Sequence, residues 1–408
     1  LIWLFLFLIS SLQHAAASDD WSSDEEAVWE RLIYFSRGGF LINNEEFLLS
    51  YPNASPTVEK KMTIDGFRKD ANLICKYPAR YQHLLGTGDI ERIEHSCPEL
   101  DEYRNRVPID DFYFIFAGKD LRSTTSMMGH GLLAVSGIDS HGATREHAFT
   151  FLADLRNAKL LPSLYMAFVS GLDGVFSLKP LSEEISRYSQ IEKREVWKLR
   201  LKFKNNQKEF LKLALWELKD ARPSYRFQSF NCATLTLHTL SIAAPHLLRH
   251  EKVFVSPVDI YKAISEEKLI AETELILDET HLANDLNEYS TNIPIHEIQD
   301  SNFGLVIGEI THLTFLGAAN YFHTPSNGNR GFLKIGALKY DVENEEIADI
   351  TLYEVLDLNN NSGTSIHMDI GIYRDRYSAN DKMNASILMS LGKTISTEKL
   401  SASLLFGG

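Results

Sequence analysis

The sequence has only three cysteines in 408 residues, and none of them stand in the Cys-x-x-Cys spacing of zinc or redox sites. It also lacks a His-Glu-x-x-His pair, a Gly-x-Ser-x-Gly elbow and a phosphate-binding glycine loop. Acidic residues outnumber basic ones, 55 to 41, which gives a net charge of -14. The absent motifs exclude the commonest metalloprotease, serine hydrolase and nucleotide-binding signatures. We expect no cofactor, no metal and no nucleic-acid partner.

The N-terminal segment is apolar but short. Leu1–Leu12 is almost wholly hydrophobic, and Ala15–Ala17 then supplies small residues before Ser18. A run of about a dozen apolar residues is too short for a membrane-spanning helix, whereas the small residues fit a signal-peptide cleavage site. We predict a signal peptide over residues 1–17 and an exported protein. Because no initiator Met or basic start precedes the run, we expect the natural chain to begin further upstream.

An odd number of cysteines in an exported chain indicates one disulfide and one free thiol. Cys75 and Cys97 lie close in sequence and in similar polar surroundings, so they are the predicted pair. Cys232 is left unpaired. A free thiol in an oxidising compartment is either buried and inert or kept for chemistry.

Periodicity divides the chain into three parts. Short amphipathic helices are predicted from Asp24 to about Asp101. Strands and then helices follow, which indicates an α+β class; the strands are 112–116, 131–135, 147–151 and 196–203, and the helices are 207–219 and 233–242.

After about residue 300, strand-like segments alternate with polar turns; they are 305–315, 331–340, 350–358, 365–373 and 385–391. Such alternation is typical of an outer-membrane β-barrel, and we predict the start of one over 300–408. A periplasmic β-sandwich or meander is the alternative. Because so few strands cannot close a membrane barrel, we expect the natural chain to continue beyond residue 408.

Cys232 follows Asn231 and opens an apolar helix. A thiol at a helix N-terminus meets the positive end of the macrodipole and unpaired N–H groups, both of which favour the nucleophilic thiolate. The same N–H groups can form an oxyanion hole. We predict that Cys232 is a nucleophile; a buried structural cysteine is the alternative.

A thiol nucleophile needs a base, and His130 is the candidate among the 14 histidines. It stands between Gly129 and Gly131 at the start of a predicted strand, where small neighbours leave the imidazole accessible. A third group should orient the ring. His147, which opens the next strand, is the predicted third catalytic residue, with Thr150 as a second candidate.

Seven landmarks stand in a fixed order between Trp29 and Ala263: Pro78-Ala-Arg-Tyr81, Cys97-Pro-Glu-Leu-Asp-Glu-Tyr103, Ser126-Met-Met-Gly-His130, Gly171-Leu-Asp-Gly174, Glu192-Lys-Arg194, Asn231-Cys232-Ala-Thr234 and Pro257-Val-Asp259. This set resembles the family named for the periplasmic N-terminal domain of Lnb, a bacterial lipoprotein N-acyltransferase. The order of histidine before cysteine is similar to that of permuted papain-like (NlpC-type) thiol enzymes.

The predicted domains are a helical cap over 24–105, a catalytic domain over 106–285 that the resemblance implies is papain-like, and the β region over 300–408. It implies acyl transfer from a phospholipid to the N-terminal amine of a lipoprotein through a thioester on Cys232. His130 would be the base, and the apolar run Leu160–Val169 would help to admit the acyl chain. The protein would be membrane-associated, in the periplasm or at the outer membrane.

Two other functions stay open at this point. A cysteine amidase or peptidase acting on peptidoglycan peptides is the commoner use of such a fold, and a catalytically dead binding module is the third possibility. An apolar tunnel beside Cys232 would favour acyl transfer, and a polar open groove would favour peptide cleavage. A blocked or distant His130 would favour the dead module.

Overall fold

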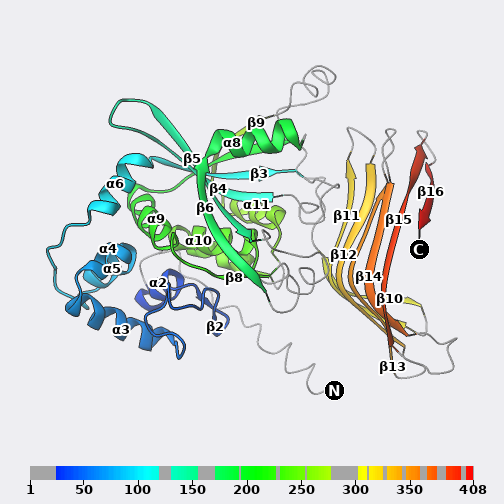
Figure 1. The fold of residues 1–408 in the computed structure, drawn as a ribbon, viewed down its shortest axis with the longest axis horizontal. Coiled ribbons are helices and arrows are strands. Elements are labelled where there is room, and N and C mark those ends of the chain that lie inside the picture. Colours follow the sequence, from blue (N-terminus) through cyan, green and yellow to red (C-terminus); the bar gives the residue numbers. More distant parts are fainter. Residues whose placement is uncertain are drawn as a thin grey trace. The chain divides into compact units, whose positions relative to one another are not determined.

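The computed structural model describes most of the chain; the described residues are 24–118, 130–154, 171–192, 194–226, 230–252, 255–276, 302–309, 312–324, 329–341, 346–358, 365–374, 383–396 and 401–407. They fall into two compact units, one within Leu1–Lys119 and Met128–Asn284 and the other within Asp285–Gly408 (Figure 1). The predicted signal peptide and the run Leu160–Val169 lie outside the described residues. Each unit is described by itself below.

The first unit begins with the predicted helical cap. Its helices are α2 (Glu25–Leu32), α3 (Pro56–Lys69), α4 (Asn72–Lys76), α5 (Pro78–Gly86) and α6 (Pro98–Arg106). Side-chain oxygens of Asp24 and Ser55 cap the first two helices by accepting backbone N–H bonds, which explains where these helices start. A small hairpin of β1 (Phe35–Ser36) and β2 (Gly39–Phe40) interrupts the helices and was not predicted.

A seven-stranded antiparallel sheet follows, with strand order β8-β6-β5-β4-β3-β7-β9. Its strands are β3 (Asp111–Ala117), β4 (His130–Ile138), β5 (Thr144–Ala153), β6 (Leu172–Pro180), β7 (Val196–Leu201), β8 (Ser224–Tyr225) and β9 (Ile270–Ile276). The predicted strands at 112–116, 131–135, 147–151 and 196–203 are confirmed. Strand β4 is central, and its residues Leu133–Ser136 pair with β3 on one side and with β5 on the other.

Helices cover the sheet. Helix α10 (Cys232–Ala243) packs on β4 and β5, α11 (Pro257–Glu266) packs on β3 and β4, and α9 (Asn205–Glu217) packs against α10. The helix α8 (Leu181–Ser186), continued by the π-helix η2 (Arg187–Ile191), contributes Leu181 and Tyr188 to a buried cluster with Ala117 and Leu132 from β3 and β4. The short 3-10 helix η3 (Pro245–His250) lies between α10 and α11 in the chain. This mixture of helices and sheet confirms the α+β class.

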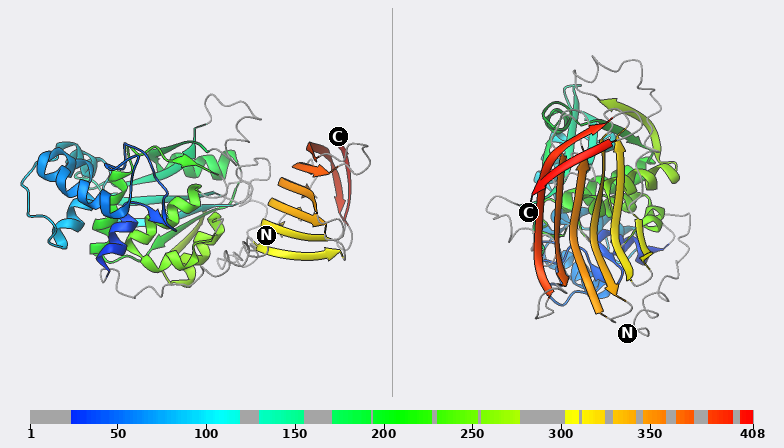
Figure 2. Two further views of the ribbon diagram at one scale, coloured as in Figure 1. Left: turned by 90° about the horizontal axis from the view of Figure 1, so that it is seen from below. Right: turned by 90° about the vertical axis from the view of Figure 1, so that its right-hand side faces the viewer.

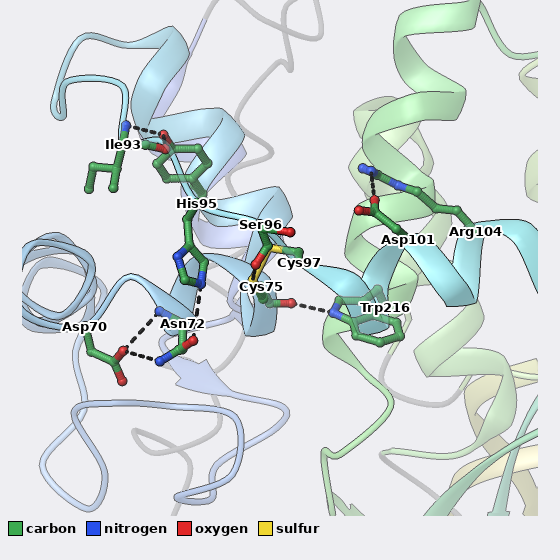
Figure 3. Close-up of a disulfide and its surroundings, with 11 residues drawn as sticks. Asp70, Asn72, Cys75, Ile93, His95, Ser96, Cys97, Asp101, Arg104 and Trp216 are labelled. Carbon is green, nitrogen blue, oxygen red and sulfur yellow. Dashed lines mark hydrogen bonds and ion pairs between the residues drawn. A yellow bond between two sulfur atoms is a disulfide. The ribbon is translucent and has the colours of Figure 1, made fainter.

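The predicted disulfide joins Cys75 of α4 to Cys97, the residue before α6 (Figure 3). The Trp216 indole of α9 donates a hydrogen bond to the Cys75 carbonyl at 2.7 Å, and its ring lies 4.9 Å from that of Tyr103 in α6. The disulfide therefore fixes the part of the cap that holds Trp216 and Tyr103.

Replacing Cys75 with serine should lower the free energy of unfolding by about 2–5 kcal/mol, because the unfolded chain regains the freedom that this crosslink removes. Urea denaturation of the two proteins measures the difference. Cys97→Ser is the matched control and should cost the same, since it removes the same bond. A loss below about 0.5 kcal/mol in both variants, the range of ordinary surface substitutions, would contradict a structural role.

A buried charge cluster ties the cap to the sheet domain. The Arg80 guanidinium of α5 lies 3.0 Å from Glu59 of α3 and 3.1 Å from Glu217 of α9, and all three side chains are almost fully buried. Glu217 also accepts the backbone N–H groups of Ala79 and Arg80, and burial raises the pKa of its carboxyl to about 7. Removing one partner of such a cluster would leave a buried charge uncompensated, so the intact cluster stabilises the packing of α9 against the cap.

The second unit consists, in its described part, of one antiparallel seven-stranded sheet whose strands pair in sequence order (Figure 2). The strands are β10 (Asn302–Glu309), β11 (His312–Thr324), β12 (Asn329–Asp341), β13 (Glu346–Leu358), β14 (Ser365–Arg374), β15 (Met383–Ser396) and β16 (Ser401–Gly407). The all-β character of this region is confirmed, whereas the barrel stays a prediction.

Two details of the strand prediction are wrong. The segment 305–315, predicted as one strand, is the end of β10 and the start of β11, which pair with each other up to Glu309 and His312. No Gly, Pro or Asn stands between these two residues, so the sequence carries no ordinary turn signal. Strand β16 was not predicted at all. Within the described ranges, no helix is both long enough and apolar enough to cross a bilayer.

Candidate active site

Asn231 determines where α10 begins. Its side-chain oxygen accepts hydrogen bonds from the Ala233 and Thr234 backbone N–H groups at 2.9 and 3.0 Å. Its amide nitrogen donates to the Val255 carbonyl at 3.0 Å. An N-cap of this kind is worth about 1 kcal/mol, and here it also anchors the cap residue to the chain before α11. Cys232 is therefore held in the first turn, as the sequence predicted.

His130 is the first residue of β4 and pairs with Ala117, the last residue of β3. The neighbouring Gly131 has a steric reason to be glycine. A Cβ atom there would lie 2.9 Å from the Phe114 ring and 3.3 Å from Cβ of Pro257, the first residue of α11. The absence of a side chain thus lets α11 pack closely on β4 beside His130.

These two elements bring the predicted pair together. Sγ of Cys232 lies 3.7 Å from Nδ1 of His130, although 102 residues separate them in sequence. The separation agrees with the 3–4 Å expected for a thiol and its base before substrate binds. Their catalytic roles stay predictions.

Burial controls the charge of both groups. It lowers the pKa of His130 to about 3, with a further contribution from the positive charges of Arg194 and Arg187. It raises the pKa of the Cys232 thiol to about 11, although backbone N–H groups of Gly131, Ala233 and Cys232 itself act in the opposite direction. The helix start does favour the thiolate, as expected, but desolvation outweighs it. At neutral pH the resting pair is a neutral thiol beside a neutral imidazole.

This charge state predicts how Cys232 reacts with iodoacetamide. Because only the thiolate is nucleophilic, the alkylation rate should rise about tenfold per pH unit between pH 6 and 9 without levelling off. Glutathione is the control, since the rate for an ordinary thiol, with a pKa of about 8.5, rises only about 1.5-fold from pH 8.5 to 9, against about threefold for Cys232. Intact-mass measurements follow both reactions. A rate that is already constant below pH 7 would instead indicate a thiolate–imidazolium pair and contradict the prediction.

Aromatic and cationic side chains surround the other side of His130. Its ring centre lies 5.5 Å from that of Tyr188, and the Arg194 guanidinium lies 5.0 Å from the Tyr188 ring. Arg194 also donates hydrogen bonds to the Ala117 and Gly118 carbonyls, so it fixes the end of β3 next to His130. Within the described residues, Nε2 of His130 is buried and has no hydrogen-bond partner.

His147, the predicted third residue, does not lie beside His130. It pairs with Val135, which is five residues further along β4, or roughly 16 Å at the rise of a strand. The expectation that His147 faces His130 is therefore not met. Thr150, the second candidate, is buried and lines the cavity beside Cys232, where its hydroxyl donates to the Ser177 carbonyl at 3.4 Å.

A cavity of about 200 Å³ opens beside Cys232. Cys232, Leu235, Thr236 and Thr239 line it from one face of α10, at the i, i+3, i+4, i+7 spacing of a helix. The rest of the lining is mostly apolar and comes from β4, β5, β6 and α9: Leu133, Phe149, Phe151, Phe176, Leu178, Leu215, Trp216 and Leu218. The remaining lining residues are Tyr103 and Arg106 of α6, Lys219 after α9, Gly131, Thr150 and Ser177. The nucleophile candidate thus faces an apolar space.

Sequence reasoning assigned no role to Tyr188 or Arg194. Arg194 stands in one of the family landmarks, Glu192-Lys-Arg194, and this landmark could have indicated it as a site residue. Among the described residues, no group of three or more His, Cys, Asp or Glu side chains is placed to hold a metal ion.

Comparison with known proteins found one family. Residues 99–267 match the family model described as the Lnb N-terminal periplasmic domain. The match covers α6, the whole sheet except its last strand, His130 and Cys232. No curated protein and no solved structure matches the chain. The family expected from the sequence is thus confirmed, and residues 99–267 form a periplasmic domain of the Lnb N-terminal type.

Proposed function

We propose that this protein is a cysteine-dependent acyltransferase, which moves a fatty acyl chain from a phospholipid to the N-terminal amine of a lipoprotein. The observation that carries the proposal is the apolar cavity beside Sγ of Cys232, which lies 3.7 Å from Nδ1 of His130. Apolar pockets bind hydrocarbon chains, whereas a peptide substrate needs polar groups along an open groove. The lining therefore favours an acyl substrate over the peptidoglycan alternative.

The reaction would run in two steps. In the first, His130 takes the proton of the Cys232 thiol as Sγ attacks the ester carbonyl, and returns it to the alcohol oxygen that leaves with the lysophospholipid. In the second, the lipoprotein amine attacks the resulting thioester and passes a proton through His130 to the departing sulfur. The product is an amide and a regenerated thiol. The backbone N–H of Cys232 is the candidate for binding the oxyanion of each tetrahedral intermediate, since those of Ala233 and Thr234 already donate to Asn231.

The wall of the cavity along α10 indicates how long a chain the cavity holds, because Cys232 and Thr239 both line it. From Cys232 to Thr239, α10 rises about 10 Å, which an extended chain covers in about eight bonds of 1.2 Å. Burial of each methylene contributes about 0.8 kcal/mol, or a factor of about four.

The acylation rate of Cys232 should therefore depend on chain length. With p-nitrophenyl esters as donors, kcat/KM should rise by about threefold to fourfold per methylene up to about eight carbons and then level off. Nitrophenol release measures it. Hydrolysis of the same esters by free imidazole is the control, since no cavity is involved. A rate that does not increase between two and eight carbons would contradict binding of the chain in this cavity.

The function itself is tested by mass spectrometry. The purified full chain is incubated with phosphatidylethanolamine vesicles, and a mass increase of one acyl group on the Cys232 peptide, lost on treatment with hydroxylamine, supports the thioester. Adding a diacylglyceryl-cysteine peptide should then discharge the acyl group onto its amine. Cleavage of peptidoglycan stem peptides without any acylation would overturn the proposal in favour of the hydrolase.

The finer points of the fold belong to the same proposal. A histidine on a sheet strand that precedes a cysteine at a helix start supports the permuted papain-like arrangement. The β region after residue 300 would place the catalytic domain at the outer membrane, next to its lipid donor.

A further inference from the structure

Strands β14 and β15 of the second unit have one mainly apolar face and one mainly polar face. On β14, Ile366, Met368, Ile370 and Ile372 alternate with His367, Asp369, Gly371 and Tyr373. On β15, Ala385, Ile387, Met389 and Leu391 alternate with Ser386, Leu388, Ser390 and Gly392. The register aligns the two apolar sets, since Met368 pairs with Met389 and Ile370 pairs with Ile387. The apolar residues thus form one continuous surface across two strands.

The apolar surface is open to its surroundings. Ile387, Met389 and Leu391 are 50%, 54% and 55% exposed, far more than large apolar side chains of a folded domain usually are. In the part of the second unit that the structure describes, neither a helix nor a second sheet covers it. A contiguous apolar patch of this kind marks an interaction surface.

The opposite face carries paired charges. Lys334 of β12 lies 2.5 Å from Glu354 of β13, and the His367 imidazole lies 3.4 Å from the same carboxylate. Asp369 lies on this face too, since it pairs with Glu354. A face that holds ionised groups in contact is the hydrated or protein-filled side of a sheet. The apolar face is therefore the one that leaves water.

We propose that the apolar face of β14 and β15, defined by Ile366, Met368, Ile370, Ile387, Met389 and Leu391, contacts the acyl chains of a lipid bilayer. Strand length fits this occupant, since β14 has 10 residues and β15 has 14, against the about 9–11 that a tilted strand needs to cross the hydrocarbon core. From Ile366 to Ile372 and from Ala385 to Leu391 this face carries no charge, and Arg374 and Lys393 follow on it only beyond these stretches, as lipid on one face requires. A second protein layer would require apolar residues only where it contacts the sheet.

Neighbouring residues on β15 provide matched probes. In the full chain with Cys232→Ser, single cysteines replace Met389 on the apolar face and Ser390 on the polar face, and each is labelled with an environment-sensitive fluorophore. The Cys75–Cys97 disulfide is left oxidised and does not react. The labelled proteins are folded into phosphatidylcholine vesicles that contain a lipid with a quencher on its acyl chain, and iodide is the aqueous quencher. Ile387→Cys and Ser386→Cys repeat the comparison one pair along the strand.

We expect the labels at 387 and 389 to be quenched severalfold more by the acyl-chain quencher than those at 386 and 390. Iodide should give the reverse order. Equal quenching at both faces, or quenching by iodide alone, would overturn the proposal. Protection of 387 and 389 from both quenchers would also overturn it, because a protein layer, such as a second copy of this chain, would then cover the face. None of these outcomes depends on acyl transfer, so the proposed function can fail while this inference stands, and the reverse also holds.

Discussion

Replacing Cys232 with serine should reduce acyl transfer by at least about 10³-fold while changing the free energy of unfolding by less than about 1 kcal/mol. The sulfur has no role in holding α10, because Asn231 supplies the cap bonds to Ala233 and Thr234. Serine fits the same space. An alkoxide, however, is much harder to form than a thiolate, and a neutral imidazole suited to a thiol abstracts the serine proton poorly.

The measurements are acyl transfer to a lipopeptide and urea denaturation, made on the same preparations. Cys75→Ser is the informative comparison, since it should lose stability through the disulfide and keep the reacting atoms of the site. If Cys232→Ser kept wild-type turnover, or unfolded as readily as Cys75→Ser, then Cys232 would be a core residue and the enzyme proposal would fall.

The two residues of the candidate dyad were predictable because each carries a local signal. An Asn-Cys pair before an apolar run is a helix start whatever the rest of the chain does, and the structure places the cap oxygen of Asn231 as this pattern requires. Gly131 beside His130 is likewise explained by a close approach of Pro257. Family resemblance then indicated that the two local signals belong to one site.

The position of His147 relative to His130 was not predictable in this way, because it depends on strand register. Alternation places His147 on a strand, but only the hairpin between Ile138 and Thr144 decides which residue of β4 it faces. That hairpin places Val135 across from His147, and the same register continued to the start of β4 would put Leu152 across from His130. Sequence alternation alone is compatible with either pairing.

Tyr188 and Arg194 were missed for a related reason. They lie 58 and 64 residues after His130, on the π-helix and the segment before β7, and they meet it only because β3, β4 and β7 are neighbours in the sheet. The sequence did not reveal the cavity itself, although an apolar tunnel beside Cys232 was named as the feature that would distinguish the candidate functions. Its lining comes from six elements, and no single stretch of sequence displays it.

Replacing His130 with glutamine should lower acyl transfer by about 10²–10⁴-fold, because glutamine fills similar space but cannot take a proton from the Cys232 thiol. Because the pKa of His130 is about 3, the imidazole is neutral, and so able to accept that proton, above about pH 4. Because the pKa of the thiol is about 11, almost no thiolate exists at pH 7 unless a base takes the proton. Activity left in the variant should therefore rise with pH as hydroxide supplies the missing base, whereas wild-type activity should depend less steeply on pH.

His147→Gln is the matched control. His147 is a histidine of the adjacent strand that lies roughly 16 Å along the sheet, so this variant should keep wild-type turnover. Initial rates between pH 6 and 9 measure all three proteins. Equal losses in the two variants would mean that both act on the fold, and full activity of His130→Gln would remove the base from the mechanism.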